Sequence, residues 1–230
     1  FCAFSHRSAT IAEPQRKCAV IVIDAFGWIA GNLPTFFKAF YQHLFMSLVS
    51  LGIAAVIAIP TGFSVARSPR IAFFIINVAG AVRSIPSLAI LSAALPILGI
   101  GIAPSIVALV VLAIPPLLLN TITGVREIDV SVLDAANGMG MGRQDILWQI
   151  EVPLATPAII TGVRTAAIQV IGGAALASFI GGGGLGDFIN TGIAIMDLPR
   201  LLVGAIPIAL LSICAEIGFG RLERALKTKR

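Results

Sequence analysis

Charged residues are scarce in this chain. Only 12% of its 230 residues are Asp, Glu, Lys or Arg, about half of the roughly 25% that is typical of soluble domains. Hydrophobic residues make up 57%, which is above the usual range of about 45–50%. This number of charged side chains is too small to cover the surface of a protein that is surrounded by water. The composition therefore excludes a soluble globular protein and indicates a chain that is surrounded by lipid.

Residues that bind metals or act as nucleophiles are also few. The cysteines, Cys2, Cys18 and Cys214, show no CxxC or metal-ligand spacing, so we interpret them as inert thiols. The histidines, His6 and His43, have no clustered acidic or cysteine partners. The sequence also lacks a GxxxxGK[ST] phosphate loop and a Ser-His-Asp or paired-carboxylate arrangement. We predict no catalytic residue, no metal site and no cofactor in this chain, and we expect it not to be an enzyme.

Long hydrophobic runs are what the sequence has instead. A helix needs roughly 20 apolar residues to cross a hydrocarbon core about 30 Å thick. Five segments meet this requirement: 44–66, 71–98, 103–125, 155–180 and 201–220. Their connections are too short to hold a soluble domain. The sequence therefore predicts an all-α integral membrane protein with five membrane-spanning helices, which form one domain over residues 44–220.

Residues 1–43 are expected to form a separate N-terminal segment. Its apolar run, 18–31, is too short to span the membrane comfortably and is interrupted by Asp24. Two interpretations remain open. The segment is either interfacial or partly inserted, or it belongs to a sixth span whose N-terminus lies inside.

The basic residues orient the spans, because Lys and Arg accumulate in cytoplasmic loops. Arg67 and Arg70 lie in the loop 67–70, and the C-terminal tail 221–230 is rich in Lys and Arg. Threading five spans places both of these segments on the cytoplasmic side together with the loop 126–153. The residues 181–200 then lie outside. The basic residues do not form one patch, so we expect membrane lipid and not nucleic acid as the partner of this positively charged chain.

The loop 126–153 is one of the few polar interruptions, and it carries residues at a fixed spacing. Asp134, Ala135 and Ala136 are followed after three positions by Gly140. After nine more positions comes Ile150, and after a further two comes Pro153. A chance match at six positions is improbable, whereas an isolated Asp-Ala-Ala has no diagnostic value.

The same loop predicts an elbow of two short helices. Asp129 is a suitable N-cap for a helix from Val130 to about Gly138. Gly140 and Gly142 permit a sharp turn. A second helix is expected to begin near Arg143, to place Ile146 and Ile150 on one side, and to end at Pro153. The expected elbow has an apolar inner edge and a polar outer surface.

This spacing resembles the EAA motif in the cytoplasmic coupling loop of ABC importer permeases. That motif has an acidic residue and two alanines, three free positions, a glycine, nine free positions and Ile-x-Leu-Pro. Asp134 replaces the usual glutamate and Val152 the usual leucine. The resemblance implies that Asp134, Ala135, Ala136, Gly140, Ile150 and Pro153 couple the chain to a separate cytoplasmic ATP-binding subunit. ATP and Mg would then belong to that partner.

Three further segments resemble permeases that import the osmoprotectants glycine betaine, choline and carnitine. They are RSIPSLAILSAALPILGIG (83–101), NTITGVREID (120–129) and ASFIGGGGLGDFINTGIA (177–194). The resemblance implies a permease subunit of the bacterial cytoplasmic membrane that works by alternating access. It also implies a second permease subunit, either identical or related, and an extracytoplasmic substrate-binding protein.

Other interpretations remain beside this one. Methionine importer permeases carry a similar glycine-rich segment, so an importer of methionine or another small amino acid is the first alternative. A membrane scaffold or passive channel is the second. Arg83 and the run Gly181, Gly182, Gly183 and Gly184 are the candidates for a pathway or gate. Arg164 and Glu216 either pair with each other or extend separately to the membrane surface.

Overall fold

Long apolar helices dominate the computed structural model, which describes residues 12–227. In this described part, α2 (Leu33–Ala66), α5 (Ile102–Arg126), the run 143–180 that contains α8 (Val152–Ala177), and α10 (Leu198–Lys227) are long and apolar enough to cross a membrane. The regular structure of these residues is entirely helical. The predicted all-α membrane fold is therefore confirmed. Cys2 and His6 lie outside the described residues.

The second predicted span, 71–98, is not one continuous helix. It consists of α3 (Pro69–Arg83) and α4 (Ser87–Leu98), which are bent by 92° relative to each other. Pro86 has an extended backbone, with φ −56° and ψ 133°. Proline lacks an N–H donor and disfavours the helical conformation of the residue before it, so the helix breaks at Ile85 and Pro86. Within residues 12–227 the five predicted spans are therefore found if this bent pair counts as one span.

The N-terminal part of the described chain is also helical. The first helix, α1 (Ala12–Gly31), is separated by Asn32 from α2, which begins eleven positions before the expected start of the first span. Pro34 lies in the first turn of α2, where its missing N–H leaves no hydrogen bond unmade. The rings of Trp28 in α1 and Phe188 in α9 (Gly186–Ala194) meet edge to face at 5.1 Å. Whether residues 1–43 are interfacial or inserted stays a prediction.

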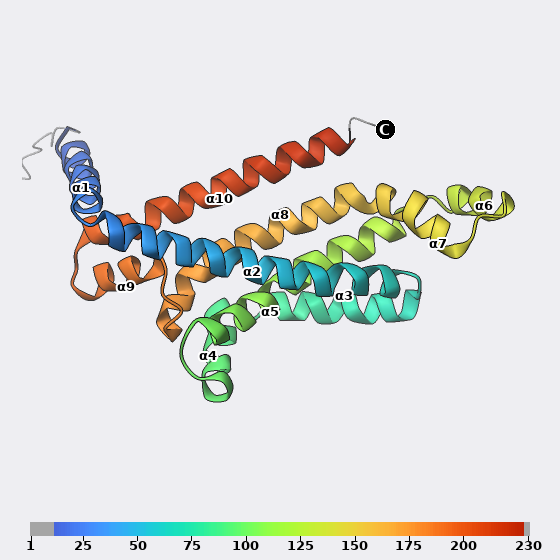
Figure 1. Ribbon diagram of the computed structural model, residues 1–230, viewed down its shortest axis with the longest axis horizontal. Helices are drawn as coiled ribbons and strands as arrows, with labels where there is room; N and C mark the ends of the chain where they lie inside the picture. The colour runs from blue at the N-terminus through green and yellow to red at the C-terminus, as the bar shows by residue number, and fades with distance from the viewer. Residues whose placement is uncertain (1–11, 228–230) are drawn as a thin grey trace, which may run out of the picture.

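The helices run roughly along one long axis, and Figure 1 shows which ends meet. The short helices α6 (Val130–Gly138) and α7 (Arg143–Ile146) project at one end of the molecule, and the loop before α3 lies toward the same end (Figure 1). Helices α1 and α9 lie at the opposite end (Figure 1). This arrangement agrees with the expected placement of the loops 67–70 and 126–153 on one side and of residues 181–200 on the other.

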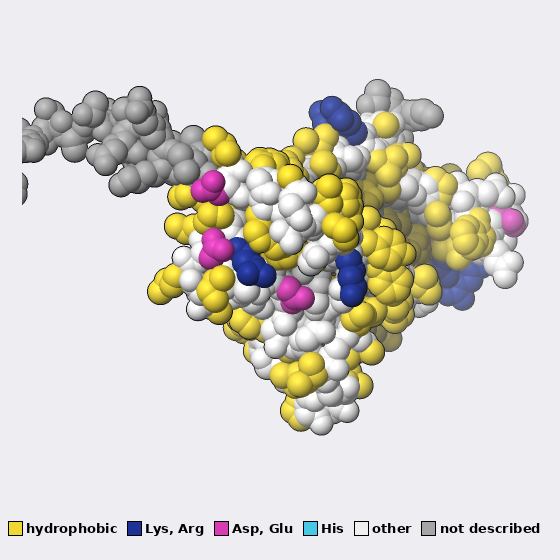
Figure 2. Space-filling view, turned by 60° about the vertical axis from the view of Figure 1, so that its left-hand side comes forward, with side chains coloured by type: hydrophobic (Ala, Val, Ile, Leu, Met, Phe, Trp, Pro, Cys, Tyr) yellow, Lys and Arg dark blue, Asp and Glu magenta, His cyan; other side chains and the backbone are white. Residues whose placement is uncertain are grey.

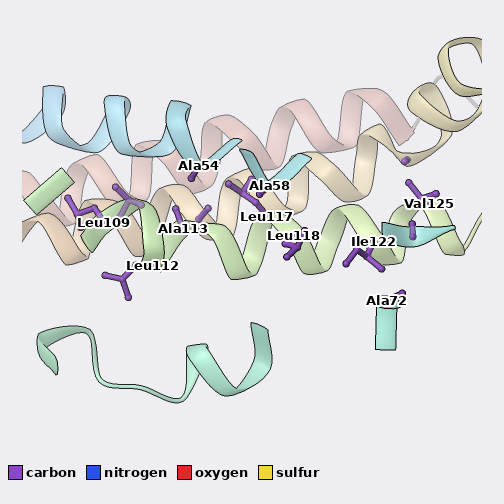
Figure 3. Close-up of a cluster of buried hydrophobic side chains, with 14 of the residues drawn as sticks. Ala54, Ala58, Ala72, Leu109, Leu112, Ala113, Leu117, Leu118, Ile122 and Val125 are labelled. Carbon is purple, nitrogen blue, oxygen red and sulfur yellow. The ribbon is translucent and has the colours of Figure 1, made fainter. Parts of the chain in front are cut away.

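Small residues allow the central helices α2, α5 and α8 to pack closely. Ala54 and Ala58 of α2 lie against leucines of α5, including Leu117, in a fully buried cluster (Figure 3). Where α5 meets α8, a β-carbon at Gly162 would lie only 3.1 Å from the carbonyl oxygen of Pro116. Close backbone approach of this kind is what holds helices together in lipid, where apolar surface alone provides no preference for a helix partner.

The outer surface of the bundle is largely apolar. Figure 2 shows hydrophobic side chains over much of one face, with the charged side chains few and scattered. Val56 on α2 and Phe73 on α3 are 75% and 70% exposed. A surface of this kind requires lipid or another membrane subunit around it.

Candidate coupling site

Asp129 caps the first helix of the elbow, which we define as residues 129–153. Its Oδ1 accepts a hydrogen bond from the backbone N–H of Ser131 at 2.9 Å, and α6 follows from Val130 to Gly138. This bond and a second from the Ser131 side chain hold the pKa of the Asp129 carboxyl below its ordinary value. The predicted cap and helix bounds are confirmed.

Helix α6 presents the motif residues to different environments. Ala136 is fully buried, whereas Asp134 and Ala135 are exposed. Ile146, on the second helix, is buried and Ile150 is half-buried. The elbow therefore has the apolar inner edge that the spacing predicts, and the motif carboxylate lies on its outer side.

The outer side of the elbow is not polar throughout, contrary to expectation. Met139 is 74% exposed and Trp148 is 68% exposed. Val130 and Val132 add exposed apolar surface on α6. Sequence reasoning missed these four side chains. Their signal was the presence of large apolar residues in a loop that lies outside the membrane spans.

The turn between the two elbow helices depends on one glycine. Gly140 has φ 76°, in the left-handed region, and no other atoms crowd the position of its missing β-carbon. Its conformation, and not a lack of space, requires glycine there. Gly142 instead has φ −69° and ψ 157°, which any residue adopts, and its N–H donates to Asp145 Oδ2 at 3.3 Å. The sharp turn at Gly140 is confirmed, and the same role for Gly142 was wrong.

Pro153 does not end the second elbow helix. Helix α7 continues through the π-helical turn η1 (Leu147–Glu151) directly into α8. Pro153 is the second residue of α8, and it supplies no N–H donor to the turn before it. The π turn changes the hydrogen-bond register immediately before it. The motif proline thus marks a joint within a continuous helical path, and the predicted helix end was wrong.

Ion pairs connect the helices around the elbow and along α8. Arg67 Nη2 donates to Glu151 Oε2 at 2.9 Å. Arg164 Nη1 lies 3.6 Å from Glu216 Oε1 and 3.4 Å from Glu223 Oε2, both on α10. Arg164 and Glu216 therefore pair and do not extend separately to the membrane surface. Neither the role of Glu223 nor the contact between Arg67 and Glu151 was predicted, because these residues lie far from their partners along the chain or carry no motif.

A groove of about 530 Å³, lined by both polar and apolar side chains, opens beside the elbow, between the end of α5, the start of α6 and the start of α8. Glu127 and Asp129 contribute carboxylates to its lining, and Asn120, Thr123 and Thr161 contribute amide and hydroxyl groups. The groove adds polar surface to the same end of the molecule as the exposed apolar side chains of the elbow.

The glycine run 181–184 lies far from the elbow and packs against other helices. Gly181, Gly183 and Gly184 have φ between 73° and 80°. Gln42 Nε2 of α2 donates to the carbonyl oxygen of Gly182 at 2.9 Å. The carbonyl of Ile180 accepts from the backbone N–H of Gly101, so the run also adjoins the turn between α4 and α5.

Arg83 is the other candidate for the pathway, and none of the described contacts joins it to the glycine run. It is exposed at the C-terminal end of α3, beside the 92° break. It forms no ion pair with any of the side chains that the structure describes, those of residues 21–226. Arg83 and the glycine run 181–184 therefore do not form one site within this chain.

Known proteins with similar sequences are membrane permeases. Carnitine transport permease protein OpuCB of Listeria monocytogenes is 41% identical over 189 residues, covering 82% of this chain and 87% of that protein. Choline transport system permease protein OpuBB of Bacillus subtilis is 39% identical over 186 residues, covering 81% of this chain and 86% of that protein. The chain thus spans most of the length of these relatives.

The fold has a solved counterpart, the inward-facing MetNI methionine ABC transporter. The alignment has a TM-score of 0.77 and 22% sequence identity, and it covers 85% of this chain and 98% of that chain. At this identity the likeness concerns the fold alone. Residues 25–228 match the family described as binding-protein-dependent transport system inner membrane component. The chain therefore belongs to this family of ABC importer permeases, as a multi-pass protein of the cytoplasmic membrane.

Proposed function

We propose that this permease imports an osmoprotectant quaternary amine, namely glycine betaine, choline or carnitine. The relatives that are named for carnitine and choline transport are 41% and 39% identical to it over more than four fifths of its length. The solved methionine transporter shares only 22% of its residues. The proposed substrate class rests on this sequence similarity to the osmoprotectant permeases.

The energy for import comes from a separate cytoplasmic ATP-binding subunit that binds the elbow, and ATP and Mg are bound by that subunit. The exposed apolar side chains of Met139 and Trp148 support this proposal, because they lie on the elbow, Met139 directly after α6 and Trp148 within the π turn η1. Water solvates such side chains poorly, and burial against a partner gains on the order of 25 cal/mol per Å². Gly140 makes the turn that shapes the same surface, and Asp134 adds an exposed carboxylate to it.

Two further partners complete the importer. A second permease subunit, identical or related, covers part of the exposed apolar surface of the bundle, and an extracytoplasmic binding protein delivers the substrate. The position of Arg83 favours the presence of the second permease subunit. An exposed cation within a membrane span is costly in lipid, so it faces either another subunit or a watery pathway. The glycine run 181–184, held by Gln42, is the proposed gate on the external side.

The role of the elbow is tested by changing the conformation of its turn. Gly140→Val places a β-branched residue at φ 76°, which it adopts only with strain. We expect copurification with the cognate ATPase and ATP-dependent uptake to fall about tenfold. Gly140→Asn is expected to retain both, because asparagine tolerates this region. Gly138→Val is the matched control, since Gly138 is helical and its surroundings are open. Unchanged assembly and uptake in Gly140→Val would contradict docking at the elbow.

The substrate is tested through the binding protein that accompanies this permease. Calorimetry against glycine betaine, choline, carnitine and methionine compares the two importer classes directly. We expect one of the quaternary amines to bind and methionine to give no heat. Binding of methionine alone would reject the osmoprotectant proposal. Uptake without ATP in vesicles that contain only the permease would instead indicate a channel.

A further inference from the structure

One ion pair fastens the base of the elbow to the turn between α2 and α3. The guanidinium Nη2 of Arg67 and the carboxylate Oε2 of Glu151 are 2.9 Å apart, although 84 positions separate them in sequence. The Glu151 side chain is only 9% exposed and the Arg67 side chain is 30% exposed. Removing one partner of a largely buried ion pair is costly, because the other charge is left without its partner. The contact therefore differs from exposed surface ion pairs, which contribute little.

Glu151 occupies the mechanical joint between the elbow and the membrane. It is the last residue of the π turn η1, and α8 begins at the next residue. Pro153 then supplies no N–H donor to the preceding turn. Helices bend where their hydrogen-bond ladder is interrupted by a π turn or a proline. A displacement of the elbow relative to α8 would therefore concentrate in the turn that holds Glu151.

Arg67 occupies a corresponding position on the other side of the contact. It is the C-cap of α2, and α3 begins at Pro69, two residues later. Helix α2 packs along α5 and α8, and α3 leads to the 92° break before α4. A displacement that reaches Arg67 would therefore move both α2 and α3. Arg70, three residues further on, is exposed and has no ion pair within the described residues.

We propose that Arg67 and Glu151 form a coupling strut, which transmits the displacement of the elbow to α2 and α3. They are positioning residues, and the strut is needed to convert ATP hydrolysis into import but not to bind the ATPase. This inference rests on the proposed function, in which the elbow binds the ATP-binding subunit. When the ion pair is broken, we expect ATP hydrolysis to continue while import largely stops.

The test uses the permease reconstituted in proteoliposomes with its cognate ATPase and binding protein. The readout is import per ATP hydrolysed, with whichever of radiolabelled glycine betaine, choline or carnitine the unmodified complex imports. We expect Arg67→Glu and Glu151→Arg each to lower this ratio about tenfold while the complex stays assembled. The double variant, with the charges exchanged, is expected to recover to within about threefold. Arg70→Glu is the matched control and should change the ratio less than about twofold.

Two results would overturn the strut. One is an unchanged ratio in the single variants, and the other is an assembled double variant that does not recover. If the charge reversals prevent assembly, Glu151→Gln keeps the shape and removes the charge, and we expect an intact complex with a ratio lowered several-fold. An unchanged ratio there also rejects the strut. Failure of docking itself is seen separately, because Gly140→Val would then leave assembly and uptake intact.

Discussion

Gly140 and Gly142 illustrate how single residues act in this protein. They are two positions apart in the same turn, yet only Gly140 has a positive φ. At Gly142 the N–H donates to Asp145 Oδ2 at the start of α7, and a β-carbon there would lie 3.0 Å from that same oxygen, at the end of a flexible side chain. The value of a glycine thus depends on the backbone conformation at its position and not on its presence in a glycine-rich turn.

At this scale we predict that Asp129 keeps α6 folded. Asp129→Ala removes the acceptor for the Ser131 N–H, so amide exchange in the first turn of α6 should become about fivefold faster. Asp129→Asn should retain slow exchange, because asparagine is an equally good cap. Hydrogen exchange followed by mass spectrometry of the segment 129–138 measures both. Equal exchange in the alanine variant and the unmodified protein would show that the cap is dispensable.

At the scale of elements, prolines have opposite effects. Pro86 accompanies a 92° break between α3 and α4, whereas Pro60 and Pro115 lie inside continuous helices. A proline inside a membrane helix is tolerated when neighbouring helices and local adjustments satisfy the freed backbone groups. Pro115 is buried in α5 among its neighbours, while Pro86 is exposed at the edge of the bundle. Pro60 is exposed as well, so burial of the proline alone does not decide whether the helix stays continuous.

Close contact between α5 and α8 gives a prediction for packing. At Gly162 a β-carbon would lie 2.9 Å from Asn120 Cβ and 3.1 Å from the Pro116 carbonyl oxygen. Gly162→Ala should therefore destabilise the permease by about 1–3 kcal/mol through overpacking. Gly172→Ala on the same helix has open space and should be neutral or slightly stabilising. Thermal unfolding of the purified variants in detergent compares them, and equal midpoints would contradict the packing at Gly162.

At the scale of the whole molecule, the bundle brings distant charges together. Arg164 of α8 lies between Glu216 and Glu223 of α10, and Arg67 meets Glu151. Pairing removes much of the cost of placing charge next to the membrane. The same arrangement puts the elbow at one end and the segment between α9 and α10 at the other (Figure 1).

The orientation of the molecule is open to direct chemical measurement. Met196, between α9 and α10, is 92% exposed, and Met139 of the elbow is 74% exposed. In a variant without the native cysteines, Met196→Cys should react with a membrane-impermeant maleimide on intact spheroplasts. Met139→Cys should react only in inside-out vesicles, because basic loops mark the elbow side as cytoplasmic. The reverse labelling would invert the topology.

The sequence by itself determined the membrane class, the capped helix at Asp129, the turn at Gly140 and the family. These depend on composition or on contacts within a few residues, which local chemistry specifies. Tertiary structure decided the continuation past Pro153, the exposure of Trp148 and the pairing of Arg67 with Glu151. Each of these depends on which helices pack together, because neighbouring helices supply the hydrogen bonds, the countercharge or the burial that the local sequence leaves open.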